Sequence, residues 1–317
     1  MAICTVEYYA EPDQIEAAHH GASARWQPTQ RGRQTAELVR TRFDKLWLGR
    51  FNESGARISH TPGIPTRSFI KFPLRTESEL IIDGRPVPAG AVVRHALADE
   101  YTERTTGRMD WALLSLPVED MIAAGLALSG HELRPPSNAL FVTPAPERMT
   151  RLRSLHDAGA SLAKYAPHVL AHPEAARALE HSIIEALVGC LTDDETTREK
   201  WARRARPTVM RRFQQVLEEN IEDPVYVPEI CKMIGVPERV LRRTCQHYLD
   251  MSPKQYLTLR RMQLARKALQ SPDVRGTSVT ETATRFGFWQ LGRFSVAYRS
   301  IFGESPSATL RRSQAGL

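Results

Sequence analysis

Hydrophobic and polar positions alternate over short segments between about residues 44 and 116. LWLGRF, RSFIKF and ELIID are examples, and turn signals such as Pro62-Gly63 and Asp83-Gly84 separate the segments. A period of two is typical of strands with one buried face, so this region predicts a small β-barrel or sandwich. Residues 1–40 are polar and irregular, and they predict loop, short helix or a frayed arm.

The pattern becomes helical after Pro117. VEDMIAAGLALSG predicts a helix that ends at Gly130. Apolar residues recur every three or four positions over 146–165 and 173–191, which predicts two further helices. Residues 192–206 are almost wholly polar and predict a linker between domains. Their acidic half precedes a basic half, so a helix held by local ion pairs is also compatible.

The last third of the chain is expected to be almost entirely helical. Ser252-Pro253-Lys254-Gln255 combines a serine N-cap, a proline in the first turn and a glutamine that completes a capping box. Ser278 and Glu281 form a second box of this kind. Seven helices are predicted, at about 208–220, 228–234, 238–247, 253–270, 279–286, 290–301 and 306–312.

Two segments of this region repeat one pattern. PEICKMIGVPERVLRRTCQHYL and TETATRFGFWQLGRFSVAYRSIF each place a small residue four positions before a glycine and an apolar residue directly after it. A steep crossing of two short helices needs a small side chain at the contact and a tight turn, which glycine makes readily. The repeat therefore predicts two helix-turn-helix units joined by the helix over 253–270.

The predicted fold class is α+β. We expect an N-terminal β-barrel or sandwich-like domain with accessory helices over 1–191, a linker over 192–206, and an all-α DNA-binding domain over 207–317. The charge agrees with this division. The net charge is +7, and residues 208–317 hold 17 Lys and Arg against 10 Asp and Glu, whereas residues 1–207 hold 26 of each. A basic domain beside a neutral one favours a polyanion partner for the basic part, although a solvated basic surface gives the same count.

The C-terminal third resembles the AraC/XylS family of bacterial transcription regulators. The first unit with YLTLRRMQLARKAL looks like that family's first helix-turn-helix and linker helix. The second unit is similar to the family signature, which is carried here by Phe286, Gly287, Phe288, Phe294, Tyr298, Phe302, Gly303 and Pro306. The resemblance implies a sequence-specific DNA-binding regulator whose N-terminal domain senses a small ligand, dimerises or does both.

The first unit departs from the family pattern at three positions. Pro237 takes the place of the usual N-cap serine, Cys245 that of a phenylalanine, and Asp250 that of a glycine. The first two changes predict a slightly altered helix start and core in this unit.

DNA-reading side chains are expected on the outer face of the second helix of each unit. The helix over 253–270 is about 27 Å long, so the two reading helices are expected roughly one DNA turn, about 34 Å, apart. Arginine and glutamine grip guanine and adenine edges through paired hydrogen bonds, and apolar side chains pack on thymine methyl groups. The base-reading candidates are Arg239, Arg242, Arg243 and Gln246 in the first unit and Gln290, Leu291, Arg293 and Val296 in the second.

Gly292 admits a close approach to DNA but weakens its helix. Other cations are expected at phosphates, with a solvated surface role as the alternative for each. The phosphate candidates are Lys232, Arg260, Arg261, Arg266, Arg285 and Arg299.

The N-terminal domain carries weaker signals. A closed barrel offers room for a small apolar or anionic ligand, and Trp47, Trp111 and Arg94 are candidates for contacting it, with a core or surface role as the alternative. The helices near 148–191 form either a dimer interface or a cover over the barrel. Control by a protein partner is a further alternative.

The sequence indicates no enzyme, cofactor or metal. His60, His95 and His131 are isolated, and His131-Glu132 lacks the second histidine of HExxH. The four cysteines have no CxxC spacing, which favours free thiols in a reducing cytoplasm. A cysteine-dependent DNA-repair methyltransferase with a similar DNA-binding module is the rival reading, but neither Cys4 nor Cys190 has the surroundings of an activated thiolate.

The expected partners follow from this interpretation. We expect double-stranded promoter or operator DNA, a small-molecule effector, contact with RNA polymerase and a homodimer. The expected location is cytoplasmic and nucleoid-associated, because no apolar run is long enough for a membrane helix and no secretory signal is visible.

Overall fold

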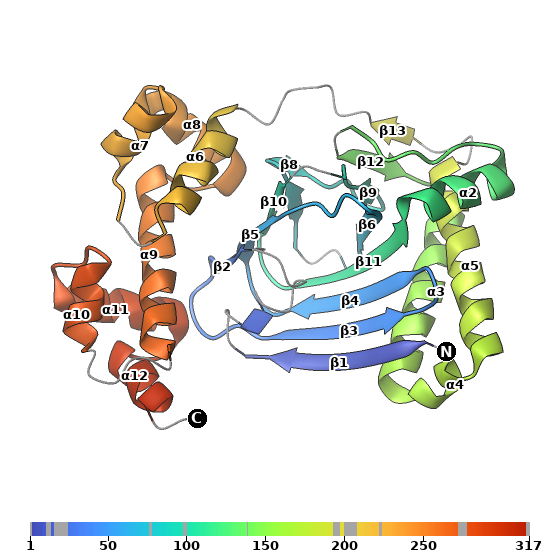
Figure 1. The fold of residues 1–317 in the computed structure, drawn as a ribbon, viewed down its shortest axis with the longest axis horizontal. Helices are drawn as coiled ribbons and strands as arrows, with labels where there is room; N and C mark the ends of the chain where they lie inside the picture. Colours follow the sequence, from blue (N-terminus) through green and yellow to red (C-terminus); the bar gives the residue numbers. More distant parts are fainter. Residues whose placement is uncertain are drawn as a thin grey trace.

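The computed structural model has a β-rich N-terminal part flanked by helices and an all-helical C-terminal part (Figure 1). It describes residues 2–10, 14–15, 25–75, 78–97, 100–137, 139–192, 197–199, 208–221, 224–271 and 278–314.

The N-terminal part contains two sheets whose paired strands are all antiparallel. The eight-stranded sheet has the order β1 (Ile3–Tyr9), β3 (Ala36–Arg42), β4 (Trp47–Glu53), β11 (Met109–Pro117), β6 (Arg67–Pro73), β9 (Val92–Arg94), β12 (Leu140–Thr143) and β13 (Thr197–Glu199). The five-stranded sheet has the order β2 (Arg25–Pro28), β5 (Arg57–Thr61), β10 (Tyr101–Thr105), β7 (Leu80–Ile82) and β8 (Arg85–Pro86). The predicted β-barrel or sandwich-like domain is confirmed.

Strand β11 shows why the predicted alternation is incomplete. All but the last of its residues are buried, because both faces of the sheet are covered. Ala112 and Leu114 belong to the core beneath the helices, whereas Trp111 and Leu113 belong to the core between the sheets. Alternate residues of one strand point to opposite faces, so this strand joins two hydrophobic cores.

Several helices lie between or after the described strands. They are α2 (Val118–Ser129), α3 (Pro146–Tyr165), α4 (Pro167–Ala171) and α5 (Pro173–Thr192). Gly130 ends α2 in the left-handed conformation, as predicted. Helices α3 and α5 lie side by side against the eight-stranded sheet, and Leu152, Ile183 and Leu187 are buried in the core that they share with it (Figure 1). These faces therefore cover the sheet.

The prediction for residues 1–40 is wrong. This region contains β1, β2 and most of β3, and β1 pairs with β3 from Ile3 opposite Arg42 to Tyr9 opposite Ala36. As an edge strand, β1 is only partly buried, so its hydrophobic signal is weak. His19 and His20 lie outside the described residues. Strand β13 falls inside the predicted linker and pairs with β12.

The described residues of the C-terminal part form the seven predicted helices, whose observed bounds are α6 (Thr208–Glu219), α7 (Val227–Ile234), α8 (Glu238–Leu249), α9 (Pro253–Gln270), α10 (Val279–Arg285), α11 (Leu291–Phe302) and α12 (Pro306–Gln314). Helix α9 runs between two clusters of helices, with α6–α8 at one end and α10–α12 at the other (Figure 1). Ser252 and Gln255 form the predicted capping box at α9, and the Ser278 side chain caps α10 by accepting from the Glu281 N–H.

The helices α6–α9 pack directly on the five-stranded sheet. Ile58 of β5 is buried in the same hydrophobic cluster as Ile230 and Leu241 of the first helix-turn-helix unit. Beside it lies buried His60, whose Nδ1 accepts a hydrogen bond from Gln214 at 2.5 Å and whose Nε2 lies 2.8 Å from the Tyr256 hydroxyl. The first unit is thus fixed to the N-terminal domain through a joint core.

Candidate nucleic-acid interface

The two helix-turn-helix units turn in the same way. Gly235 follows α7 at φ 71°, and Gly287 follows α10 at φ 77°. The residue after each glycine donates its backbone N–H to the small residue of the repeat: Val236 to the Cys231 carbonyl at 3.1 Å, and Phe288 to the Ala283 carbonyl at 2.9 Å. The repeated spacing therefore gives the same type of turn after the first helix of each unit.

Paired apolar residues hold each second helix against its own unit. In the first unit Leu241 and Cys245 are fully buried. In the second unit Phe294 and Tyr298 are buried, with ring centroids 5.6 Å apart. Because these residues are four apart, they occupy one face of the helix and leave the opposite face to solvent.

The first recognition helix, α8, presents its predicted side chains outward. Arg239, Arg242, Arg243 and Gln246 are exposed and border one shallow surface depression together with Glu238 and His247. Arg242 forms an ion pair with Glu238 at 2.9 Å, and Gln246 donates to Asp250 at 2.9 Å. Both partners are themselves exposed, so DNA can compete for these donors at small cost.

The three departures from the family pattern have clear structural consequences. Pro237 offers no side-chain cap, and its carbonyl accepts from Val240 and Leu241 instead. Cys245 fills a core position, where burial raises the pKa of its thiol to about 12. Asp250 ends α8 at φ 57°, a left-handed conformation that a non-glycine residue adopts at some cost, and its carboxylate pairs with Arg104 at 3.0 Å.

The second recognition helix, α11, has a different outer face. Leu291, Gly292, Arg293, Val296 and Arg299 are exposed, and Gln290 is half-buried at the N-cap. Counted from the first residue of each helix, Gly292 takes the place of Arg239 and Val296 that of Arg243. Trp289, which is not among the predicted contacts, is 81% exposed in the turn before α11. An aromatic residue between the signature glycine and the helix start was the available signal.

Four of the six phosphate candidates reach the surface at least in part. Lys232, Arg285 and Arg299 are exposed. Arg261 is half-buried, and its guanidinium lies 5.4 Å from the ring centroids of both Tyr226 and Phe288.

The other two phosphate candidates are buried. The Arg260 guanidinium donates to the Leu217 carbonyl inside the first unit. Arg266 pairs with Glu304 at 3.2 Å and lies over the Phe302 ring. The structure places both guanidiniums within the protein, because the inner side of α9 faces the two cores and the N-terminal domain, so neither is a phosphate contact in this conformation.

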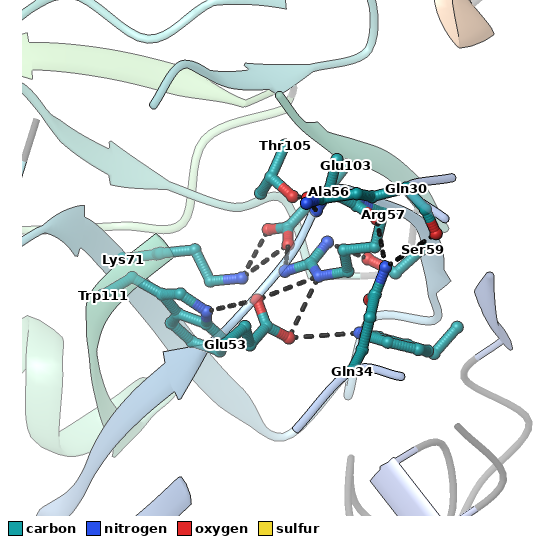
Figure 2. Close-up of polar contacts among 11 residues, drawn as sticks. Gln30, Gln34, Glu53, Ala56, Arg57, Ser59, Lys71, Glu103, Thr105 and Trp111 are labelled. Carbon is teal, nitrogen blue, oxygen red and sulfur yellow. Dashed lines mark hydrogen bonds and ion pairs between the residues drawn. The ribbon is translucent and has the colours of Figure 1, made fainter. Parts of the chain in front are cut away.

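A buried ion cluster fills part of the space between the two sheets. The Arg57 guanidinium lies between the carboxylates of Glu53 and Glu103, at 3.0 and 3.2 Å, and Lys71 donates to Glu103 at 2.6 Å (Figure 2). The indole N–H groups of Trp26 and Trp111 donate to Glu53 at 3.1 Å. Two acids and two bases compensate each other here.

The cluster controls its own protonation. Burial alone would raise the pKa of Glu103, but Lys71 and Arg57 outweigh this effect and hold it at about 2. Burial lowers the pKa of Lys71, and the charge of Glu103 opposes that effect. Of the residues in this cluster, only Trp111 was a predicted site residue; Lys71 between Ile70 and Phe72 in a predicted strand was the available signal for the others.

A small cavity of about 60 Å³ adjoins the cluster. Its lining includes Lys71, His95, Tyr101 and Trp111, and burial lowers the pKa of His95 to about 4, so this ring is neutral. Of the three predicted ligand contacts only Trp111 lies here. Arg94 donates to the carbonyls of Leu133 and Arg134. The Arg67 guanidinium lies 3.8 Å from the ring centroid of Trp47. Arg94 and Trp47 therefore make contacts within the domain.

The described residues offer little to the rival chemistries. No group of three His, Cys, Asp or Glu side chains in them is arranged to hold a metal ion. Burial raises the pKa of Cys4, Cys231 and Cys245, which is opposite to what an activated thiolate requires. Within the same ranges, no helix has the length and hydrophobicity needed to cross a bilayer.

Comparison with known proteins gives matches concentrated in the C-terminal part. A family model described as a helix-turn-helix domain matches residues 230–312. The probable thc operon regulatory protein of Rhodococcus erythropolis is 34% identical over 146 residues, which cover 46% of this chain and 44% of that protein. The XylDLEGF operon transcriptional activator 1 of Pseudomonas putida is 36% identical over 101 residues, 32% of this chain and 30% of that one.

Solved structures match either most of the chain or about its last third. The AraC-like transcriptional activator CuxR is 14% identical, with a TM-score of 0.42, over 82% of this chain and 95% of that one. A probable AraC family regulator from Rhodopseudomonas palustris CGA009 is 30% identical, with a TM-score of 0.31, over 33% of this chain and 96% of that one.

The matched part spans less than half the length of the two curated relatives named above. Within that part, the family model and the two glycine-ended turns both indicate helix-turn-helix units, and the relatives are named as regulatory proteins. The C-terminal part therefore contains a helix-turn-helix domain, as the sequence predicts, and it is similar in sequence to transcription regulators.

Proposed function

We propose that this chain is a sequence-specific DNA-binding transcription regulator whose α8 and α11 enter successive major grooves. The exposed Arg239, Arg242 and Arg243 on α8 carry the proposal most directly, because arginine is the commonest reader of guanine edges. The positions of α8 and α11 at opposite ends of α9 support the two-groove arrangement (Figure 1). Duplex DNA as partner puts the site of action at the bacterial nucleoid.

The N-terminal domain is proposed to sense a small ligand in the cavity beside Lys71 and Trp111. Strands β5 and β10 support this role, since they border both the cavity and the DNA-binding domain. Thr61 and Tyr101 line the cavity, whereas Ile58 and His60 contact the helices α6–α9. We also propose that the protein dimerises and contacts RNA polymerase.

The raised pKa values of the Cys4 and Cys245 thiols favour a regulator over a cysteine-dependent methyltransferase.

Selection of bound duplexes from a random DNA pool tests the proposal. The full-length protein is expected to enrich one sequence with two conserved segments. The triple variant Arg239→Ala, Arg242→Ala, Arg243→Ala should lose the segment read by α8 and keep weak general binding. Arg151→Ala, an exposed arginine of the N-terminal domain, is the matched control. Failure of the unmodified protein to enrich any sequence would refute the specific-regulator function.

A further inference from the structure

The surface around the start of α11 is unusually apolar for an exposed surface. Trp289 is 81% exposed and Val296 is 73% exposed, while Leu291 beside them is 38% exposed. The corresponding face of α8 carries three arginines and a glutamine. Water-exposed tryptophan is costly, so an apolar surface of this kind is typical of a binding site.

One exposed face of α11 belongs to this surface. Gly292, Val296 and Arg299 follow each other at spacings of four and three, so they lie along one face of α11. The opposite face holds buried Phe294 and Tyr298. Trp289 directly precedes the N-cap residue Gln290, which places its side chain near the end of the helix that enters a groove first in helix-turn-helix proteins.

Gly292 is not required by the fold. Its φ lies outside the left-handed region, and a Cβ built on it meets no atom within 4 Å. Alanine would therefore fit and would favour the helix. A residue without a side chain at the centre of an exposed face lets the backbone approach a partner closely.

The cations around this face indicate a polyanion. Arg293 and Arg299 on α11 and Arg285 on α10 are exposed beside the apolar residues. Both recognition helices are attached to α9, with α8 in the helix cluster at one end and α11 in the cluster at the other (Figure 1). The apolar group that duplex DNA offers in its major groove is the thymine methyl.

We infer that α11 recognises thymine methyl groups by apolar contact, through Trp289 and Val296, with Gly292 allowing the helix to lie close to the base edges. This inference rests on the proposed function and adds the base chemistry that the second unit reads. The two units then divide the work: arginine forks read guanine at α8, and a methyl-binding surface reads thymine at α11.

Replacing thymine by uracil tests the inference, because it removes the methyl group and leaves the hydrogen-bonding edge unchanged. The probe is the duplex enriched by the full-length protein, with single thymines replaced in turn. Loss of one contacted methyl is expected to weaken binding about fourfold, from roughly 0.8 kcal/mol per buried carbon. The sensitive thymines should all lie in the segment bound by α11.

Variants show which side chains are responsible. The Val296→Ala and Trp289→Ala proteins should bind the thymine duplex more weakly than the unmodified protein does. In these variants, replacing thymine by uracil should cause little further loss of affinity. Gly292→Ala should keep or raise the thermal stability and still weaken DNA binding. Leu310→Ala, a residue packed inside the same unit, is the control for an effect through folding.

Two results would overturn the inference while leaving the DNA-binding function intact. One is unchanged affinity when every thymine of the enriched duplex becomes uracil. The other is a uracil effect of equal size in the unmodified protein and in both the Val296→Ala and Trp289→Ala proteins, which would mean that neither side chain contacts the methyl groups.

Discussion

The first helix-turn-helix unit shares its hydrophobic core with the N-terminal domain, whereas the second has a core of its own. Ile58 of β5 is buried among residues of α6–α9. The second unit instead packs Phe286, Phe294, Tyr298 and Phe302 on α9. It touches the N-terminal part through sparser contacts, such as the Gly32 N–H to the Ser300 carbonyl at 3.1 Å.

This difference suggests that changes in the N-terminal domain affect the first helix-turn-helix unit more than the second. In β5, Arg57 belongs to the ion cluster inside the N-terminal domain, while the neighbouring Ile58 and His60 contact the first unit. Alternate residues of a strand face opposite sides, so a shift of this strand moves both surfaces together. We expect changes inside the N-terminal domain to reach α8 more strongly than α11.

The largest effect is expected from Glu103→Gln. The substitution leaves Lys71 and Arg57 without part of their compensating charge in a buried site, and breaking such a cluster costs roughly 3–5 kcal/mol of unfolding free energy. Chemical denaturation measures it. The matched control is the double variant Lys71→Met, Glu103→Leu, which removes one charge of each sign and should be less damaging. A single variant as stable as the unmodified protein would contradict the proposed role of the cluster.

The same carboxylate predicts a pH dependence. The folded-state pKa of Glu103 is about 2, below its ordinary value of 4.5. A depressed pKa contributes stability that is fully present above the ordinary value and is lost as the pH falls toward the folded value. The unmodified protein should therefore lose stability between about pH 4.5 and 2 more steeply than Glu103→Gln does. Parallel acid-unfolding curves for the two proteins would argue against this assignment.

A smaller effect is expected from Arg242→Ala. Loss of one paired contact to guanine should weaken specific binding by about 1–3 kcal/mol and relax one base preference. Titration of the enriched duplex and of single-base variants measures both. An equal loss on every sequence would make Arg242 a phosphate contact. Glu238→Gln, which removes the ion-pair partner of Arg242, should strengthen binding slightly.

Gln214→Leu tests the attachment of the first unit. The change removes the amide that donates to His60 Nδ1 and leaves Thr102 Oγ1, at 3.1 Å, beside that nitrogen, so the loss of one buried hydrogen bond is expected to cost about 0.5–1.5 kcal/mol. We expect lower stability and weakened protection of the DNA segment bound by α8, with the α11 segment almost unchanged. Gln215→Leu, at the exposed neighbouring position, is the control. Equal weakening of both segments would remove the distinction between the units.

The smallest effect is expected from Arg104→Ala. Its ion pair with the half-exposed carboxylate of Asp250 links β10 to the end of α8 at 3.0 Å. Pairs of this exposure contribute about 0–1 kcal/mol, and salt screens them. The destabilisation should shrink as the salt concentration rises. A loss that does not depend on salt would point to packing of the arginine stem instead.

The helical domain was predictable because its signals are local. Capping serines, turn glycines and apolar pairs four residues apart define each helix within a few positions, and the observed bounds follow the predicted ones. The ion cluster could not be found this way, since Arg57 and Glu103 meet from strands 46 residues apart in sequence. The burial of Arg260 and Arg266 was not predicted either, because helical spacing does not show which face of α9 packs on other elements.

Strand β1 shows a further limit. Its order comes from backbone pairing with β3 over seven residue pairs, and each of its side chains is either half-buried or exposed. An edge strand of this kind needs few hydrophobic residues, so its sequence resembles that of a loop. Only the pairing partner, distant in sequence, reveals it.

Dimethyl sulfate interference on the enriched duplex tests the two-groove account most directly, because methylation of guanine N7 blocks the edge that an arginine fork contacts. The account predicts that methylation of guanines in the segment bound by α8 interferes with binding of the unmodified protein. In Arg242→Ala, methylation of the guanine contacted by this residue should no longer interfere. A thymine-sensitive segment should lie about one helical turn, roughly 34 Å, away on the same face of the duplex. A single contacted segment, or two on opposite faces, would contradict it.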